Sequence, residues 1–445
     1  MKNDECNFIP SSLAACFIDN KEVHIMKMSS RGIFIRTIEA EDNITKINMS
    51  FYDFSKSKYQ EIEIRNIEVE KVNKNEFYYI YKIIINDENY VNMVNFIFRD
   101  YSRYVTLKNY GEENEFSEVM TGYPAEKDFD FYEFYDDQKK DLIKDVDFDK
   151  FNYILKDVEL ACTINTDELC DKYLLNNIYE FTKYYLEDNY IYSSSMLKKK
   201  FSRIYIGNEF CHNLFPKKDI LLKMLNKALL EKVNITICFT YMRECYIEKN
   251  KEILEKIYKW CKKSNKKVEI VINDWGMIKL ICGKEDFFSI NLGILLNKRK
   301  KDPRFIFKKG FNENRELLSE NSLNVPLYRE FLKQYGIKRF EFETSLYKLK
   351  IPKGKHSLHM PFYITNTSQY CPLYAMCTKM DRGEQILVKN CPKYCTDYIF
   401  SYPKHLKMVG KYNSLFSFDD TILKDSEKLN YYLKNGIDRI VLNFI

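Results

Sequence analysis

RIYIGNEFC, residues 203–211, begins the stretch that decides the fold. Short apolar runs of this kind alternate with longer segments whose apolar residues return every three or four positions, as in buried strands and amphipathic helices. Such an alternation predicts a parallel sheet with helices on its outer face. The strand-like runs include RIYIG (203–207), NITICFTY (234–241), KVEIVIN (267–273), RFEFE (339–343), SLHMPFYIT (357–365) and RIVLNF (439–444), and the helix-like segments include KKDILLKMLNKALLEK (217–232), NKEILEKIYKWCKK (250–263) and TILKDSEKLNYYLKNG (421–436).

The chain divides into three parts by its pattern. Residues 201–445 have the length of one (β/α)8 barrel, roughly 250 residues, so we expect an α/β fold with a TIM-like barrel there. Residues 1–115 show short alternating strands and polar turns, such as Ser29–Gly32, and end in a helical pattern over 88–107, which predicts a small N-terminal β-barrel closed by a helix. Residues 116–200 mix acids with aromatics, which predicts an acidic linker and a docking helix.

Composition and charge restrict the function only mildly. The 70 basic and 64 acidic residues leave a formal charge of +6, so nucleic-acid binding has to rest on local patches. LKKKFSR (197–203) and NKRKKDPR (297–304) are such patches, and RNA contacts are one interpretation of them. We favour the other, a solvated charged loop, because the runs are short.

The sequence also indicates the compartment. Its 13 cysteines are odd in number and scattered, which is not the pattern of a disulfide scaffold. The first residues do not join a basic segment to an apolar one, and no run of 18 apolar residues occurs. We therefore expect a cytoplasmic protein that does not interact with membranes.

Four cysteines cluster near the C-terminal end: Cys371, Cys377, Cys391 and Cys395, with the spacing C-x5-C-x13-C-x3-C. Each half of the motif can place two thiolates on one side of a turn, as metal and iron-sulfur sites require. The spacing is not that of a zinc ribbon, but four thiolates suit tetrahedral zinc as well as a cubane. Both metals stay open at this point.

Polar residues follow several predicted strands, and in a parallel barrel such strand ends form the active site. Asn273, Asp274 and Glu343 are the candidate catalytic residues that we select there, because strand-end carboxylates can bind a hydroxyl or transfer a proton. His359, inside a predicted strand, is a candidate base. The structural alternatives are that Asp274 caps the next turn and that His359 is a hydrogen-bonded core residue.

Residues 203–445 resemble the collagenase-like peptidase family, which includes the barrel proteins UbiU and UbiV of oxygen-independent ubiquinone hydroxylation. The resemblance is carried by the order of YIGNEFC (205–211), VINDWGMIKL (271–280), LGILLNKRKKDPR (292–304), NTSQYC (366–371) and YYLKNGIDRIVLNF (431–444).

The resemblance implies a [4Fe-4S] cluster at the barrel mouth, rather than zinc. Cys371, Cys377, Cys391 and Cys395 match the clustered cysteines of the family most simply. In the UbiV-like branch one ligand comes from the loop after the first strand, which here is Cys211. A small buried side chain is the structural alternative for Cys211.

Three functions follow from the resemblance and the motifs. The first is an iron-sulfur-dependent, oxygen-independent modification of hydroxylation type, acting on a small molecule or RNA, with a hetero-complex partner possible in principle. The second is a peptidase of the same family, although the chain has neither H-E-x-x-H nor G-x-S-x-G. The third is a non-catalytic regulatory or scaffolding protein with a structural or redox-sensing cluster.

The N-terminal part resembles a degenerate PilZ domain, a bacterial barrel that binds cyclic di-GMP. The Ser29-x-x-Gly32 turn and the final helix carry this resemblance. The family clamps the nucleotide with an R-x-x-x-R segment, whereas here no arginine precedes Arg31, and Lys27 occupies the acidic or amide position of the turn. We therefore do not expect cyclic di-GMP binding.

Overall fold

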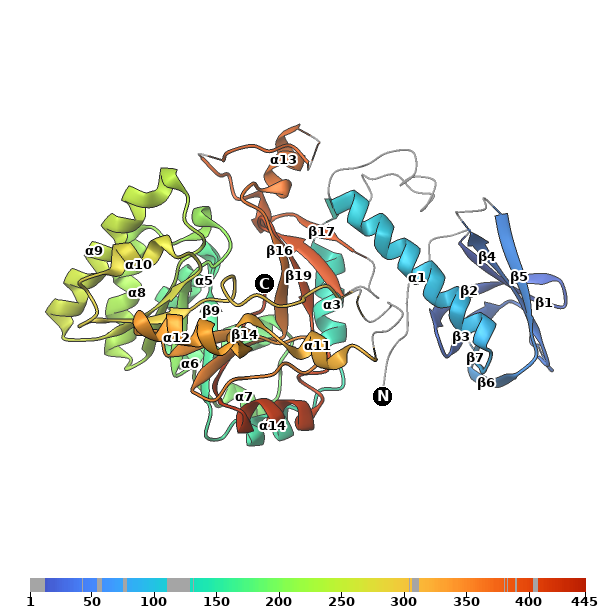
Figure 1. The fold of residues 1–445 in the computed structure, drawn as a ribbon. Helices are drawn as coiled ribbons and strands as arrows, with labels where there is room; N and C mark the ends of the chain where they lie inside the picture. The colour runs from blue at the N-terminus through green and yellow to red at the C-terminus, as the bar shows by residue number, and fades with distance from the viewer. Residues whose placement is uncertain are drawn as a thin grey trace.

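The computed structural model describes residues 13–41, 43–53, 58–74, 78–109, 129–130, 132–303, 305, 312–379, 381, 383–388, 390–402 and 407–445. They form an antiparallel sheet with one long helix and, as a separate body, a larger α/β part (Figure 1). Within these ranges, no helix combines the length and the apolar character that crossing a membrane requires.

The N-terminal sheet is antiparallel, with the order β5-β4-β1-β2-β3-β7-β6. Only Arg65 and Asn66 separate its two edge strands, so these meet at one end, but no ladder joins them among the described residues. The predicted closed barrel is thus an open sheet, whose edge strands carry charged residues that discourage further pairing. The strands are β1 (Ala14–Ile18), β2 (Lys21–Ser29), β3 (Gly32–Thr37), β4 (Ile47–Asp53), β5 (Lys58–Ile64), β6 (Ile67–Lys74) and β7 (Tyr79–Ile85).

Helix α1 (Glu88–Asn109) covers this sheet, as the helical pattern predicts. Val94 and Phe98 are buried in the same core as the strands. The hydroxyl of Tyr90 donates to the backbone oxygens of Ser29 and Gly32, at 2.7 and 3.1 Å, and so fixes the β2–β3 turn against the helix. A side chain at Gly32, where φ is +148°, would collide with the backbone of β7.

Eight parallel strands form a closed barrel, which confirms the expected α/β fold with a parallel barrel. Each strand pairs with the next strand of the series, and β20 pairs with β9 to close the ring. The strands are β9 (Glu159–Ile164), β10 (Arg203–Gly207), β11 (Asn234–Cys238), β12 (Val268–Ile272), β13 (Phe288–Leu292), β14 (Arg339–Glu343), β15 (His356–Met360) and β20 (Ile437–Leu442).

The first barrel strand, β9, lies within 116–200, where the sequence predicts a linker and a docking helix. The barrel therefore starts before the predicted boundary at 201. Its short run, ELACTI, contains Ala and Cys instead of several large β-branched residues, so it gives a weak strand signal. Residues 116–128 of the predicted linker lie outside the described residues.

Helices connect most of the barrel strands. The segment 344–355, all of which is described, carries β14 to β15 without a helix, so a helix after every strand is not observed. The helices of the α/β part are α3 (Tyr132–Ile143), α4 (Phe148–Ile154), α5 (Asp167–Leu175), α6 (Ile178–Asp188), α7 (Ser194–Leu197), α8 (Lys218–Leu230), α9 (Ile247–Ser264), α10 (Gly276–Ile281), α11 (Arg315–Ser319), α12 (Pro326–Gln334), α13 (Pro372–Lys379) and α14 (Ser426–Lys434).

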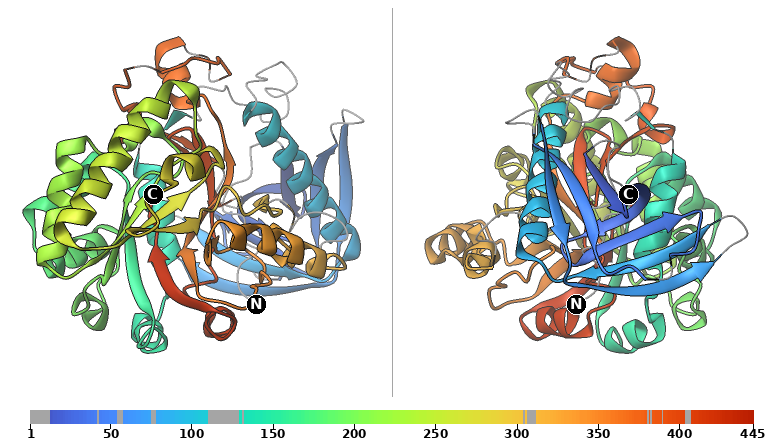
Figure 2. Two further views of the ribbon diagram at one scale, coloured as in Figure 1. Left: turned by 60° about the vertical axis from the view of Figure 1, so that its left-hand side comes forward. Right: turned by 90° about the vertical axis from the view of Figure 1, so that its right-hand side faces the viewer.

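A second sheet is inserted between β15 and β20. The expected strand 357–365 is divided at Pro361: β15 stays in the barrel, and β16 (Phe362–Thr367) leaves it to pair with β19 (Ser414–Phe418). The sheet is completed by β18 (Met408–Lys411), β17 (Ile399–Ser401) and β8 (Phe129–Asp130). Helix α13 lies at one end of the α/β part and α14 at the other (Figures 1 and 2).

Candidate functional site

Four cysteine thiols come together from three segments of the chain. Cys211 follows β10, Cys371 immediately precedes α13, and Cys391 and Cys395 lie in the loop that returns from this helix to β17. Cys211, Cys391 and Cys395 each raise the pKa of Cys371, and Cys391 also raises the pKa of Cys211 and of Cys395. The set therefore contains the first-strand cysteine together with three of the four clustered ones.

The pKa shifts describe this proximity. Burial raises the pKa of Cys211 to about 11, and the neighbouring Cys391 thiol contributes. Burial also raises the pKa of Cys371, and the thiols of Cys211, Cys395 and Cys391 add to the shift. For Cys395 burial raises the pKa to about 12, with contributions from Cys211 and Cys391.

Cys377 differs from these four. It lies within α13, and burial alone raises its pKa, without a contribution from another cysteine. Six residues of an α-helix turn the side chain by about 240°, so a residue six positions after Cys371 faces another direction. The structure thus sets Cys377 apart from the group that Cys211 joins.

Backbone N–H groups are directed at all four sulfurs, and that of Cys395 is approached by its own backbone N–H. Tyr374 donates to Sγ of Cys371 and Lys393 to Sγ of Cys391, each at 3.4 Å. The N–H groups of Asn213 and Leu214 favour the thiolate form of Cys211. Such N–H···S contacts are among the interactions that tune thiolate-bound clusters.

The donor set fits a thiolate-bound metal group, although the side chains are not in a preformed ion cage. Every cysteine among the described residues is free. No group of three or more His, Cys, Asp or Glu side chains in the described part is arranged to hold a metal ion directly. The four thiols, their N–H donors and the nearby Lys393 and Lys411 cations provide the right ligand chemistry.

The predicted base His359 points into the barrel. It is 2% exposed, its Nε2 lies 3.0 Å from Oε2 of Glu341, and Tyr205 contacts its ring edge to face. Burial would lower the pKa of His359, but the hydrogen bond to Glu341 and the charge of Glu209 outweigh it and raise the pKa. His359 is therefore one half of a buried ion pair.

Glu343, at the end of β14, is also buried and paired. Lys301 donates to its Oε2 at 2.7 Å, and the backbone N–H of Ile364 donates to Oε1 at 2.6 Å. The Arg299 guanidinium lies 3.7 Å away. Because only 2% of the Arg299 side chain and 14% of the Lys301 side chain are exposed, the prediction of a solvated loop at 297–304 is wrong for these two residues.

Asn273 and Asp274, although adjacent, point to different places. The Asn273 amide donates to Glu209 at 2.8 Å and to the Phe239 carbonyl at 2.9 Å, at the barrel mouth. Asp274 is partly exposed and accepts the N–H of Gly276 at 2.7 Å, as a turn cap does. The carboxylate that accompanies Asn273 is therefore that of Glu209.

Glu209, Glu341 and Glu343 thus surround His359. Burial raises the pKa of Glu209 to about 6, against the opposing influence of His359 and Asn273. Sequence reasoning missed Glu341 and the two cations of the 297–304 loop. The signal was present in RFEFE, because alternate residues of a barrel strand point inward and here two of the three residues on that face are glutamates.

The barrel interior below this cluster is equally polar. Arg439, 2% exposed, makes a bidentate contact with Glu269 at 2.7 and 2.9 Å and donates to Glu159 at 2.6 Å. It also donates to the hydroxyl of Tyr205, which in turn donates to Glu341 at 3.1 Å. One hydrogen-bonded network therefore fills the barrel from its lower end to His359.

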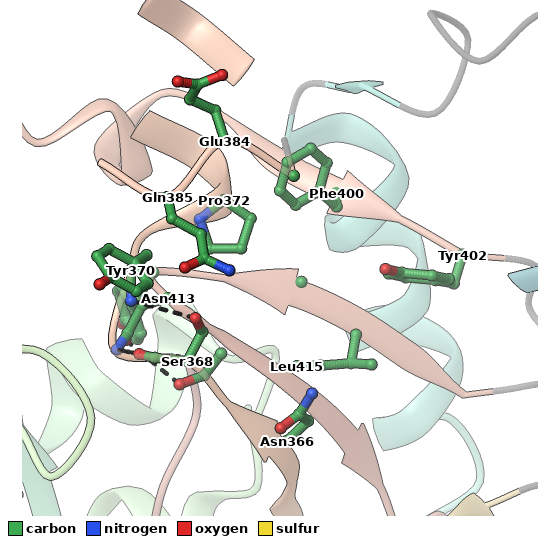
Figure 3. Close-up of a pocket in the computed structure, with 14 residues that line it drawn as sticks. Asn366, Ser368, Tyr370, Pro372, Glu384, Gln385, Phe400, Tyr402, Asn413 and Leu415 are labelled. Carbon is green, nitrogen blue, oxygen red and sulfur yellow. Dashed lines mark hydrogen bonds between the residues drawn. The ribbon is translucent and has the colours of Figure 1, made fainter. Parts of the chain in front are cut away.

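A pocket of about 210 Å³ lies on the inserted sheet, next to Cys371 (Figure 3). Tyr370 and Pro372, on either side of this cysteine, line it, and the thiol of Cys371 donates to the carbonyl of Tyr412, another lining residue, at 3.3 Å. The Gln385 amide and the Tyr402 hydroxyl are directed toward the same space in Figure 3. The lining residues are Asn366, Ser368, Tyr370, Pro372, Gly383, Glu384, Gln385, Phe400, Tyr402, Gly410, Tyr412, Asn413, Ser414 and Leu415.

Asn413 connects this pocket to the loop that carries Cys211. Its side-chain amide donates to the carbonyl of Phe210 at 2.8 Å, to the carbonyl of Ser368 and to the hydroxyl of Tyr241 at 3.1 Å. The pocket and the cysteine group therefore share a common support. Asn273, Glu343 and His359 do not belong to the lining of this pocket.

Comparisons with known proteins do not assign a family. No family model and no curated protein matches the chain. A solved structure of an uncharacterised Legionella protein is similar over 23% of this chain and 99% of its own length, at 11% identity and a TM-score of 0.17. A likeness of that extent carries no argument about fold or function.

Proposed function

We propose that this protein carries a [4Fe-4S] cluster on Cys211, Cys371, Cys391 and Cys395 and uses it for an oxygen-independent modification, of hydroxylation type, of a small molecule or RNA. The observation that carries the proposal is the meeting of these four thiols from three segments. The reaction type comes from the resemblance of residues 203–445 to the collagenase-like peptidase family. We also propose that the parallel barrel is a variant of the (β/α)8 type with an inserted sheet.

Cys211 is the preferred fourth ligand over Cys377. A ligand set needs sulfurs that face one site, and Cys377 has no cysteine neighbour that affects its pKa. The backbone N–H donors at Cys211, Cys371 and Cys391 support the same choice, because they compensate the negative charge of thiolates. Zinc on the same four thiols is the competing metal.

When bound, the cluster supplies one-electron transfer or Lewis-acid iron. The protein's own groups then have separate tasks. Lys411, whose pKa burial lowers to about 8, lies beside Cys395 and contributes positive charge. Gln385 and Tyr402, in the pocket next to Cys371, can orient a substrate by hydrogen bonds. The oxygen atom comes from a donor other than O2, for which the resemblance implies an organic acid such as prephenate.

A non-catalytic regulatory role with a redox-sensing cluster is the second candidate. The observation that favours it is the barrel mouth, where His359 and Glu343 are 2% and 3% exposed and are held by Glu341 and Lys301. Such groups stabilise the fold without needing a substrate. No observation favours the peptidase alternative, because its candidate base His359 is 2% exposed and does not line the pocket next to Cys371.

Metal analysis tests the cluster. We expect anaerobically purified protein to contain about four irons and four sulfides per chain, with broad visible absorption that disappears in air. One zinc per chain, or no metal at all, would overturn the proposal. The protein concentration, to which the metal content is referred, is obtained from the amino-acid composition of the purified chain.

Mass spectrometry separates the two candidate roles. RNA nucleosides and small molecules from anaerobic cells that express the wild type or Cys391→Ala are compared for species that gain one oxygen atom. An added species that requires Cys391 supports the modifying enzyme. A cluster-loaded protein without any such species supports the regulatory role.

A further inference from the structure

A second pocket lies at the opposite end of the barrel, where strands β10, β11 and β12 begin. Its volume is about 320 Å³. It is bounded by the turns that lead from α8 into β11 and from α9 into β12. The cysteine group is at the other end of these strands, since Cys211 follows the last residue of β10. The lining residues are Arg203, Ala228, Leu229, Lys232, Val233, Asn234, Ile235, Trp260, Lys266, Lys267, Val268, Glu269 and Ser289.

Three lysines of this pocket lack acidic partners. Lys232, in the turn after α8, and Lys266 and Lys267, after α9, are exposed, and none forms an ion pair with another described residue. The two turns are neighbours because β11 and β12 are adjacent parallel strands. The fold therefore places three lysines from two turns in the lining of one concave site, where their like charges favour a bound anion.

The floor of the pocket is rigid, and its charges are paired with one another. Arg203 is 9% exposed and is fixed by Glu159 at 2.9 Å and by the hydroxyl of Thr236 at 3.1 Å. Glu269 is the one carboxylate of the lining, and Arg439 already binds it in bidentate fashion. Arg203 and Glu269 are therefore neutralised by their own partners, and the three lysines carry the excess positive charge of the pocket.

Neutral groups complete the site. Asn234 and Ser289 are exposed, and Trp260 forms part of the wall. The Asn234 amide already donates one hydrogen bond to Glu159 at 3.1 Å and has a second N–H for a ligand, and Ser289 offers a hydroxyl. The Trp260 indole N–H is bound to Asn226 at 2.7 Å, which holds the ring in place. A pocket of this size with converging polar groups can enclose a small molecule.

We propose that this pocket binds a small molecule that carries a phosphate or diphosphate group. Lysine ammonium groups are suited to phosphate as compact point charges, and the hydroxyl and amide of the lining can donate to its remaining oxygens. Reactions in parallel barrels take place at the carboxyl ends of the strands, so a ligand at this end regulates or anchors the protein rather than reacting. The site is independent of the cluster.

Trp260 provides the measurement. Trp260 and Trp275 are the two tryptophans of the chain, so Trp275→Phe leaves a single tryptophan, in the wall of the pocket, whose fluorescence is excited selectively over that of the tyrosines. Pyrophosphate is added to the full chain in this background, at low and at higher salt. We expect a saturable change in fluorescence that weakens with salt, and each single Lys→Gln change at 232, 266 or 267 should weaken binding about two- to fivefold.

Charge reversal supplies the matched control. Lys232→Glu, Lys266→Glu and Lys267→Glu together should abolish binding. Lys223→Glu, Lys259→Glu and Lys263→Glu change the net charge equally, lie on exposed positions of α8 and α9 outside the pocket, and should leave binding intact. Equal loss in both triple variants, or no saturable change with pyrophosphate, overturns the proposal. If a short RNA binds more tightly than pyrophosphate through the same three lysines, the proposal of a small-molecule ligand is wrong. Iron content is measured in the same variants. If pyrophosphate binding fails while the iron content is retained, the phosphate proposal is wrong and the cluster proposal is unaffected.

Discussion

The cysteine group and the barrel interior both contain ionisable side chains that are buried or partly buried, but these side chains find different partners in the two regions. In the interior, Arg439, Glu341 and His359 each meet a partner of opposite charge within the protein. At the cysteine group, Cys211, Cys371 and Cys391 receive backbone N–H groups but have no disulfide partner. The comparison teaches that a perturbed pKa alone does not mark a site, because the shifted groups of the interior are ion-paired within the protein, whereas these three thiols have neither an ion-pair nor a disulfide partner among the described residues.

The largest stability effect is expected at Glu341, in the centre of the interior network. Glu341→Ala removes the acceptor of Tyr205, His359 and Asn291 and leaves a buried charge without its partner. We expect a loss on the order of 3–5 kcal/mol in the free energy of unfolding, measured by urea denaturation. Glu341→Gln keeps part of the hydrogen bonding and should lose less. Equal stability of the alanine variant and the wild type would show that the interior is not held by this network.

Glu269 should contribute to the pH dependence of the free energy of unfolding. Burial opposes its ionisation, but the hydrogen bonds of Arg439 and the charge of Arg203 outweigh this and lower its pKa to about 2. Its stabilisation is therefore present above the ordinary glutamate pKa and is lost as the pH falls toward 2. The stability difference between the wild type and Glu269→Gln should shrink by about 3 kcal/mol over that window. Exposed Glu330→Gln is the control, and a constant difference for Glu269→Gln would contradict the prediction.

A smaller effect is expected from the cation that binds Glu343. Lys301→Met removes a 2.7 Å contact to a buried carboxylate, which keeps Arg299 and the Ile364 N–H as partners. We expect a loss of about 1–3 kcal/mol in unfolding free energy. The neighbouring Lys300 is exposed, so Lys300→Met should change stability by less than about 0.5 kcal/mol. If both variants change the free energy of unfolding by similar amounts, the 297–304 loop is solvated at Lys301 as well.

The smallest effect is expected at Asp274. Its one hydrogen bond, to the Gly276 N–H, is partly exposed, so Asp274→Ala should cost about 0.5–1 kcal/mol and leave the metal content unchanged. A variant that loses metal, or any modifying activity of the wild type, would return Asp274 to the catalytic residues. Asn273→Ala, which breaks two buried hydrogen bonds, is the contrasting variant and should destabilise more.

The sequence predicted the barrel strands where apolar β-branched residues dominate, as in β10, β11 and β12. It missed β9, because the ELACTI run has few large β-branched residues and so gives a weak strand signal. It also predicted one strand across Pro361, where the structure has β15 and β16. The alternation of side chains along a strand predicts that Glu341 points inward. Its partners come from strands distant in the sequence, so the alternation does not predict them. Lys301, from a loop, could not be matched to Glu343 without the fold.

In the candidate site, too, the sequence predicted what lies within one segment and not what the fold brings together. Local spacing identified Cys371, Cys391 and Cys395, because they lie within one segment. Residue spacing could not choose between Cys377, which is near in sequence, and Cys211, which lies 160 positions before Cys371. Only the packing of the β10 loop against the α13 segment separates the two. The pocket next to Cys371 likewise combines residues of the inserted sheet with a loop and has no sequence signature.

The central claim is tested most directly by iron and sulfide content in two single variants, Cys211→Ser and Cys377→Ser, purified anaerobically beside the wild type. The account predicts that the wild type and Cys377→Ser contain about four irons and four sulfides, and that Cys211→Ser loses the cluster. Both variants must show the same circular dichroism as the wild type. Loss in Cys377→Ser with full retention in Cys211→Ser would contradict the assignment of the fourth ligand, and iron-free wild-type protein would contradict the cluster itself.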